Sequence, residues 1–332
     1  MVVQLCLTLL TICVLASPGL AQEDPAATVG GYGLPHLFGL PTATTTRLFG
    51  MGGITACLPD AGFANPAFAG DLNTENMGVR YSLTDFDFGL RLKGLQGWFS
   101  TPIGSRDGLQ VVGFWLDSDT GGLMTLGGMV NADFYEGDIS LHYGRRVHDQ
   151  VLVGIGISPV LSTGTDLTAP LGGTVLQSLQ SRVGIGARLG AVYEFGEDSR
   201  LGIVVDRYTE DVSMTAPTEL GPVEFDAWEY AFGISHRVNP RILLAAEWSE
   251  LVNEAGEVRN VFSGWHFGAE YMINSQAALR VGSNDRQLSV GFGYNAGRWA
   301  ANYAYLKDWN DNVVGDLLGG SDTQQIEITA SW

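Results

Sequence analysis

The chain ends in Gln325-Ile326-Glu327-Ile328-Thr329-Ala330-Ser331-Trp332, where polar and apolar residues alternate without a break. Successive side chains on a β-strand point to opposite faces, so this period places the even-numbered residues on one face and the odd-numbered residues on the other. A strand with one apolar and one polar face is typical of a wall between lipid and an aqueous interior. The ending therefore predicts the closing strand of a transmembrane β-barrel.

The same alternation recurs along most of the chain. In Leu288-Ser289-Val290-Gly291-Phe292-Gly293-Tyr294-Asn295 every even position is apolar and every odd one is Ser, Gly or Asn. Residues 183–195 alternate in the same way, with Val192 as the exception, and further examples are 151–158, 241–249, 265–271 and 299–305. Together with weaker segments these give about fourteen strands, with an error of about two. We predict an all-β, antiparallel barrel over residues 77–332.

Composition supports a barrel over a helical membrane protein. The 332 residues include 45 Gly, 10% aromatic and only 16% charged residues. After the amino terminus, no apolar run is long enough to cross a bilayer as a helix. Because lipid offers no hydrogen bonds to the backbone, a closed barrel is the remaining way to span it.

The amino terminus predicts export. Residues 2–16 are mostly apolar, and Ser17-Pro18-Gly19-Leu20-Ala21 supplies small residues before a cut ahead of Gln22, so we expect residues 1–21 to be a signal peptide. This segment lacks the basic residues that usually begin such a signal. Its removal would discard Cys6 and Cys13 and leave Cys57 alone, which excludes a disulfide framework.

Connector lengths predict the orientation. Short connectors rich in turn formers lie at 145–150, 196–200, 237–240, 274–275 and 295–297, and longer ones at 117–133, 159–179, 209–222, 251–260 and 308–322. Bacterial barrels of this class place short turns in the periplasm, which puts the carboxy terminus there too. A terminal aromatic such as Trp332 resembles the signal by which the barrel-assembly machinery recognises outer-membrane proteins. The expected location is the outer membrane.

Residues 22–76 do not alternate, and a barrel of this size can hold them in its lumen. They contain Gly50-Met51-Gly52-Gly53-Ile54-Thr55-Ala56 and then Asn65-Pro66-Ala67. This region resembles the amino-terminal part of the FadL/TodX family of outer-membrane transporters for hydrophobic compounds, and of the related PorV/PorQ-type barrels. The resemblance implies a hatch folded inside the barrel.

The resemblance assigns a hatch motif to six residues, Gly50, Gly52, Gly53, Asn65, Pro66 and Ala67. The alternative is that Asn65-Pro66 is an ordinary turn between two segments, because this dipeptide favours turns wherever it occurs.

Charged residues opposite the apolar stripe are expected in the lumen: Arg80, Arg91, Lys93, His142, Arg188, Glu194, Glu229, Arg241, Glu247, His266, Glu270 and Arg280. An arginine suits a fatty-acid carboxylate through its two-pronged guanidinium, so the candidate partners are Arg80, Arg91, Arg188, Arg241 and Arg280. Alternatively these charges pair with one another and hold the wall or hatch in place, since unpaired buried charge is costly.

Two further features bear on a route for cargo. The outward connector 117–133 carries Leu123, Met124, Leu126 and Met129, which could capture a lipophilic ligand or pack over the barrel mouth. In residues 110–116 the alternation breaks around Gly113, which suggests a bulge. In the family that the hatch resembles, a kinked strand opens the wall sideways. A simpler interpretation is that the apolar inward residues pack against the hatch.

Motifs and charge limit other functions. No Gly-x-Ser-x-Gly, His-Glu-x-x-His or phosphate-binding loop occurs, so no enzyme is predicted and no cofactor or metal is expected. The net charge of −18 argues against nucleic acid as a partner. It also disfavours anionic cargo, whereas neutral aromatics or alkanes would not be repelled.

The leading hypothesis is a monomeric outer-membrane channel, surrounded by lipid, for passive uptake of small hydrophobic molecules of the long-chain fatty acid or aromatic hydrocarbon class. The alternative is a PorV/PorQ-like accessory for protein secretion or surface attachment. An open general porin comes third, because it leaves residues 22–76 without a role.

Overall fold

The computed structural model describes residues 45–59, 64–86, 91–119, 121–125, 128–168, 175–215, 220–255, 258–284, 287–308 and 321–332. The expected signal peptide, residues 1–21, and the first part of the expected hatch, residues 22–44, lie outside this range. Among the residues described, two short helices precede the strands, α3 at Thr46–Phe49 and η2 at Pro66–Asp71. Within the described residues, no helix has the length and apolarity to cross a membrane.

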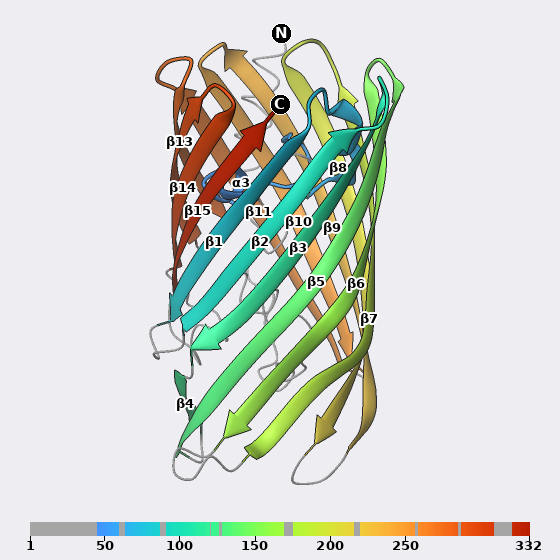
Figure 1. The fold of residues 1–332 in the computed structure, drawn as a ribbon, viewed down its shortest axis with the longest axis vertical. Coiled ribbons are helices and arrows are strands. Elements are labelled where there is room, and N and C mark those ends of the chain that lie inside the picture. The colour runs from blue at the N-terminus through green and yellow to red at the C-terminus, as the bar shows by residue number, and fades with distance from the viewer. Residues whose placement is uncertain are drawn as a thin grey trace.

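The strands form one antiparallel sheet in which successive strands pair, except that β3 and β4 both pair with β5 (Figure 1). Their bounds are β1 Asn76–Phe86, β2 Arg91–Pro102, β3 Asp107–Asp119, β4 Gly121–Thr125, β5 Gly128–His148, β6 Val151–Thr168, β7 Val175–Glu194, β8 Ser199–Thr215, β9 Leu220–Asn239, β10 Ile242–Ala255, β11 Val258–Met272, β12 Ala277–Asn284, β13 Gln287–Ala296, β14 Trp299–Asp308 and β15 Ser321–Ser331.

The sheet closes into a barrel because β1 pairs with both β2 and β15, and β3 pairs with β5. The short strand β4 prolongs β3 along the same partner: Asp117 lies opposite Tyr135, and Gly121 lies opposite Ala132. Of the 15 strands in the sheet, β4 is therefore a continuation, which leaves a ring of fourteen. The strand number predicted from the alternation is confirmed.

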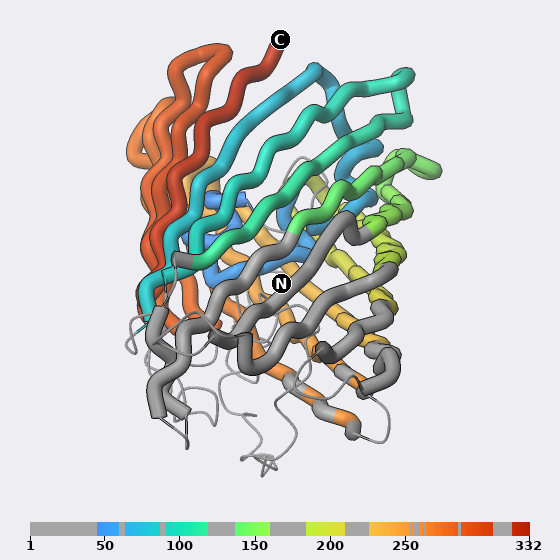
Figure 2. The backbone as a smooth tube through the Cα atoms, turned by 60° about the horizontal axis from the view of Figure 1, so that its bottom comes forward, coloured from blue at the N-terminus to red at the C-terminus, as the bar shows by residue number. Residues whose placement is uncertain are grey.

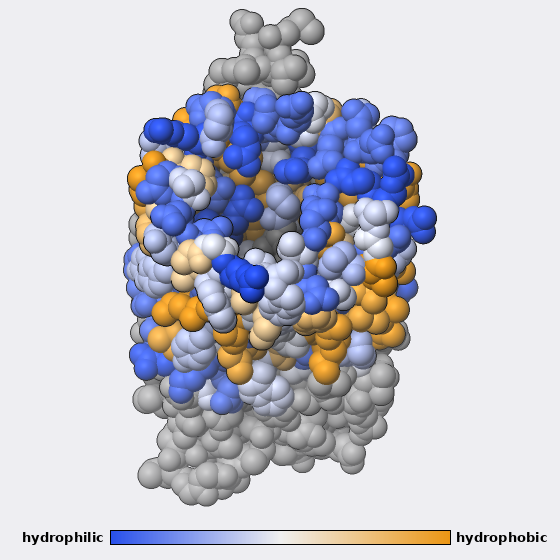
Figure 3. All heavy atoms as spheres, turned by 45° about the horizontal axis from the view of Figure 1, so that its top comes forward, coloured by the Kyte–Doolittle hydropathy of each residue, from blue (hydrophilic) through white to orange (hydrophobic). Residues whose placement is uncertain are grey.

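The two faces of β15 point as predicted, with the apolar face outward and the polar face inward. Ile326 and Ile328 are 54% and 48% exposed on the outer surface, whereas Gln325 and Glu327 are 3% and 2% exposed and face inward. Outward apolar residues of the other strands continue this surface around the barrel, where Figure 3 shows apolar side chains in a band beside a polar rim. Such a band matches the hydrocarbon layer of a bilayer.

All the predicted short turns lie at one end of the barrel, which we call the short-turn end, together with Trp332 (Figure 1). There the backbone N–H of Trp332 donates to the carbonyl of Glu75, and its indole N–H donates to the Glu75 carboxylate at 2.6 Å. The last residue of the chain is thus joined to the residue that precedes β1, where the barrel closes.

The connectors at the opposite end, the hairpin end, differ from the prediction. Residues 117–133, 159–179, 209–222 and 251–260 were expected to be loops, but strands occupy most of each segment. Strand pairs such as β6–β7 and β8–β9 therefore continue as hairpins past the alternating segments. Hydropathy alternation needs lipid on one side and a polar interior on the other, so it cannot detect strands that extend beyond the lipid.

Candidate functional site

The described part of the hatch, residues 45–59 and 64–72, lies inside the barrel (Figure 2). Helix α3 packs against β13, β14 and β15, and η2 packs against β3, β5, β6 and β7 on the other side. Leu48, Met51 and Ile54 are fully buried and form a core cluster with Leu243 of β10. The hatch therefore bridges opposite walls of the lumen.

Glycines on the wall receive the hatch. At nine inward positions a Cβ atom would come within about 3 Å of hatch atoms; we call these the glycine belt: Gly108, Gly144, Gly154, Gly190, Gly202, Gly233, Gly268, Gly282 and Gly291. Many are neighbours across strands: Gly108 lies opposite Gly144, Gly144 opposite Gly154, and Gly154 opposite Gly190. The belt thus continues from strand to strand around the lumen.

At seven of the nine positions the nearest hatch atoms include backbone atoms, whereas Gly190 and Gly233 face the side chains of Asn65 and Cys57. A Cβ added at Gly202 would lie 1.9 Å from the carbonyl oxygen of Ala56, and one added at Gly282 would lie 2.0 Å from the nitrogen of Gly52. Only a residue without a side chain permits such an approach. Any larger residue would have to displace the hatch.

Glu247 of β10 anchors the middle of the hatch. Its side chain is 1% exposed, and it accepts hydrogen bonds from the backbone N–H of Thr55 at 2.9 Å, the Thr55 hydroxyl at 2.9 Å and the backbone N–H of Ala56 at 2.6 Å. Three donors on one carboxylate offset the cost of burying its charge.

Two more carboxylates anchor α3. The Glu270 carboxylate of β11 accepts hydrogen bonds from Nε and Nη2 of Arg47, both at 2.9 Å, and from Nε of Arg280 at 2.7 Å. Glu327 of β15 accepts the backbone N–H of Thr46 at 2.9 Å. The hatch is therefore bound to the wall by ionic hydrogen bonds as well as by packing.

A histidine and a serine hold the glycine turn. His266 places Nδ1 2.7 Å from the carbonyl oxygen of Gly52, so Nδ1 carries the proton. In neutral His266, Nε2 then accepts from the Ser249 hydroxyl at 2.9 Å. The Ser289 hydroxyl accepts the backbone N–H of Gly52 at 3.0 Å. Polar wall residues thus bind both backbone groups of Gly52.

The six motif residues lie within this arrangement. Gly50 packs against Gly291, while Gly52 and Gly53 have φ of +83° and +77°, a left-handed conformation that side chains disfavour. Asn65 caps η2 by accepting the backbone N–H of Ala67 at 3.0 Å, and its amide donates to the carbonyl of Ala56 at 2.7 Å. Pro66 begins η2. The two motif segments are therefore hydrogen-bonded to each other.

The five candidate arginines divide into two groups. Arg80, Arg188 and Arg280 face inward, as predicted. The prediction for Arg91 is wrong: it shares the outward face of β2 with the exposed Leu95 and Phe99, and so does Lys93. Arg241 is exposed in the β9–β10 turn and is also not a lumen residue.

The bulge expected at Gly113 is absent. Gly113 lies opposite Gly97 of β2 and Ile139 of β5, and the register of β3 is unbroken along both partners. The register shifts instead between Gly137 and Asp138, where β5 meets β6. A single glycine in a strand therefore did not mark an irregularity here.

The proposed capture residues lie in a hairpin, not in an irregular loop. Leu123 and Met124 belong to β4, and Met129 belongs to β5, while Leu126 lies outside the described residues. Their role in capturing a ligand stays a prediction.

The inner wall carries an apolar stripe on β2 and β3, formed by Leu92, Trp98, Val112, Phe114 and Leu116, all below 9% exposed. It lies on the hairpin side of the hatch, because Gly108, which contacts the hatch, precedes the stripe residues of β3. The Trp98 ring covers Gly78, where a Cβ would lie 2.2 Å from it. These buried side chains form an apolar part of the inner wall, beside the inward polar residues Gln96 and Gln110.

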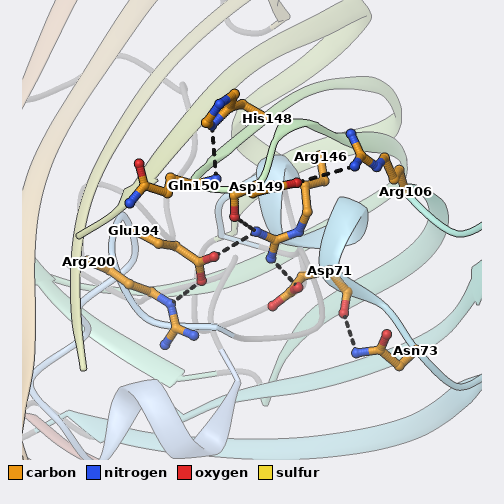
Figure 4. A network of polar contacts seen from close by, with 9 residues as sticks. All are labelled: Asp71, Asn73, Arg106, Arg146, His148, Asp149, Gln150, Glu194 and Arg200. Atoms are coloured by element: carbon orange, nitrogen blue, oxygen red, sulfur yellow. Dashed lines mark hydrogen bonds and ion pairs between the residues drawn. The ribbon is translucent and has the colours of Figure 1, made fainter. Parts of the chain in front are cut away.

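A network of charges connects the hatch to the short-turn end (Figure 4). Arg146 of β5 binds Asp71 at the end of η2 and binds Glu194 of β7 at 2.7 Å. Glu194 also accepts Nε of Arg200 at 2.9 Å. The second end of the hatch is thus fixed to three strands near their turns.

Comparisons with known proteins find similar solved structures. CymD, a monoaromatic hydrocarbon channel, has 16% sequence identity and a TM-score of 0.62, over 88% of this chain and 98% of that one. The toluene transporter TodX of Pseudomonas putida has 14% identity and a TM-score of 0.59, over 86% and 96%. A FadL homologue of Pseudomonas aeruginosa has 14% identity and a TM-score of 0.58, over 87% and 98%. These likenesses establish the fold.

No family model and no curated protein sequence matches this chain. The chain therefore shares the fold of these channels, although their sequence identity is too low for sequence comparison to detect the similarity.

Sequence reasoning missed the glycine belt and the anchoring role of Glu247, Glu270 and His266. The available signal was the recurrence of glycine at inward strand positions, because a lumen that contains only water has no need of so many residues without side chains.

The belt predicts that Gly202→Ala disturbs the hatch, because the new methyl group would overlap the Ala56 carbonyl. We expect a loss of roughly 1–3 kcal/mol in stability, as for an overpacked core. The measurement is the midpoint of urea unfolding, followed by gel mobility without boiling. Gly113→Ala is the control, since its methyl group meets nothing within 4 Å. Equal midpoints for the two variants would contradict direct backbone packing.

Glu247→Gln should weaken the hatch anchor by roughly 2 kcal/mol, because an amide NH₂ would face backbone donors that now meet a carboxylate. The readout is proteolysis of the hatch in the folded barrel, which should become faster. Glu250→Gln, which removes the same charge on the outward face of β10, is the control. If the hatch of Glu247→Gln resists protease as well as that of the control, the anchor is unimportant.

Proposed function

We propose that this protein is a monomeric outer-membrane channel that lets small hydrophobic molecules cross passively, without a cofactor. The observation that carries the proposal is the apolar stripe on the inner wall, next to a hatch that is fixed in the lumen. A channel for polar solutes gains nothing from buried Trp98, Val112 and Phe114 on its inner surface, whereas a lipophilic molecule gains apolar contact there.

The similar structures support this choice, since two of them are a monoaromatic hydrocarbon channel and a toluene transporter. The apolar outer band supports a position in a lipid bilayer. In the orientation predicted from the connector lengths, the short-turn end faces the periplasm. The barrel-assembly machinery would recognise Trp332 during insertion.

The two alternatives gain no support. A secretion or attachment accessory is not favoured by the geometry of the described residues or by these three similar structures. An open porin is disfavoured because residues 45–59 and 64–72 cross the lumen and bind its wall.

The Ser249–His266 pair has the hydrogen bond of a nucleophile and its base. Its third partner, however, is the Gly52 carbonyl, so the pair serves to hold the glycine turn. We therefore propose transport without catalysis.

The test is initial uptake of radiolabelled toluene by cells that express this protein and lack similar channels. Wild type should exceed empty-vector cells severalfold. Phe114→Glu should abolish most of this excess, because it places a charge in the apolar stripe.

Trp115→Gln changes the adjacent residue on the outer face and should keep uptake near the wild-type rate. Each variant is first shown to be folded by its gel mobility without boiling. Uptake at the empty-vector rate by folded wild type would refute the channel, and wild-type uptake by folded Phe114→Glu would refute the role of the stripe.

A further inference from the structure

All the inward-facing cations among the described residues are engaged by acids. Arg47 and Arg280 share Glu270. Arg80 lies opposite Glu327 in the β1–β15 register and interacts with it electrostatically, and Arg188 binds Asp206. The arginines that could have met a fatty-acid carboxylate are therefore already partnered by carboxylates of the protein.

Arg188 has more than one acidic neighbour. Arg188 of β7, Asp206 of β8 and Glu229 of β9 lie directly opposite one another on adjacent strands. Nε of Arg188 donates to the Asp206 carboxylate at 2.9 Å, and Arg188 also interacts electrostatically with Glu229 and Asp138. One guanidinium is thus surrounded by three carboxylates.

These residues lie on the hairpin side of the hatch. On β7, Arg188 is the next inward position beyond Gly190, which contacts Asn65 of the hatch. On β9, Glu229 likewise lies on the hairpin side of Gly233, which contacts Cys57 of the hatch. Cargo that enters from the hairpin end would meet this acidic group before it reaches the hatch.

Resting on the proposed function, we infer that Asp206, Glu229 and Asp138 determine its specificity: they occupy Arg188, so that the channel passes uncharged hydrophobic molecules and rejects anionic ones of the same chain length. The apolar stripe on β2 and β3 carries no charge and therefore does not distinguish the two kinds of molecule. The acidic group around Arg188 distinguishes them by charge.

Uptake of radiolabelled decanoate and methyl decanoate at pH 8 tests this inference, because the two differ mainly in charge. Wild type should take up the ester well above empty-vector cells and decanoate only slightly. The double variant D206N/E229Q frees Arg188 and removes two negative charges. We expect it to raise the ratio of decanoate to ester uptake about fivefold.

Asp85→Asn is the matched control. Asp85 also pairs with an arginine, Arg91, but on the outer face, so its removal changes the net charge without changing the lumen. Its uptake ratio should equal that of wild type. A second variant, D138N/E229Q, keeps the Arg188–Asp206 pair and should raise the ratio if the first variant does not fold.

Salt supplies an independent readout. Added NaCl should raise decanoate uptake by wild type more than by the folded double variant, because ions screen the repulsion.

The outcomes separate the two claims. If wild type takes up the ester and decanoate equally, or if folded variants keep the wild-type ratio, the charge filter is refuted while the channel stands. If folded wild type takes up neither above empty-vector cells, the channel is refuted and the filter with it.

Discussion

Direct packing of the hatch backbone on inward glycines is the constraint on which the rest of the structure depends. A strand wall normally presents side chains to its lumen, and these would keep a second backbone several ångströms away. At Gly202 and Gly282 the wall presents none, so the hatch reaches the strands themselves. This approach brings the Thr55 and Ala56 amides onto Glu247 and the Thr46 amide onto Glu327.

The barrel could be predicted from the sequence because a lipid-facing strand must alternate, and the fourteen-strand ring follows from counting such segments. The same physics explains the errors. Strands at the hairpin end continue past the alternating segments, so they were taken for loops. Arg91 was assigned to the wrong face because both faces of β2 carry glycines and apolar residues, so hydropathy does not distinguish the inward face from the outward one. Glu247 looked like any inward charge, since its partners are backbone amides that are distant in sequence.

Fixing the hatch also separates two tasks within the lumen. Hydrogen bonds donated by the hatch to the carboxylates of Glu247, Glu270 and Glu327 hold it in place, while the buried stripe around Phe114 forms an apolar part of the wall on the hairpin side. The acidic residues around Arg188 form a separate group, which distinguishes cargo molecules by their charge.

Alkylation of Cys57 tests most directly whether the hatch is fixed in the lumen. Cys57 is fully buried beside Gly233, and this burial raises the pKa of its thiol, so both access and reactivity are low. Folded barrels in isolated membranes would be treated with iodoacetamide at pH 8, and the peptide that contains Cys57 quantified by mass spectrometry. The account predicts almost no modification until urea unfolds the barrel. Modification of the folded barrel as fast as the unfolded chain would contradict it.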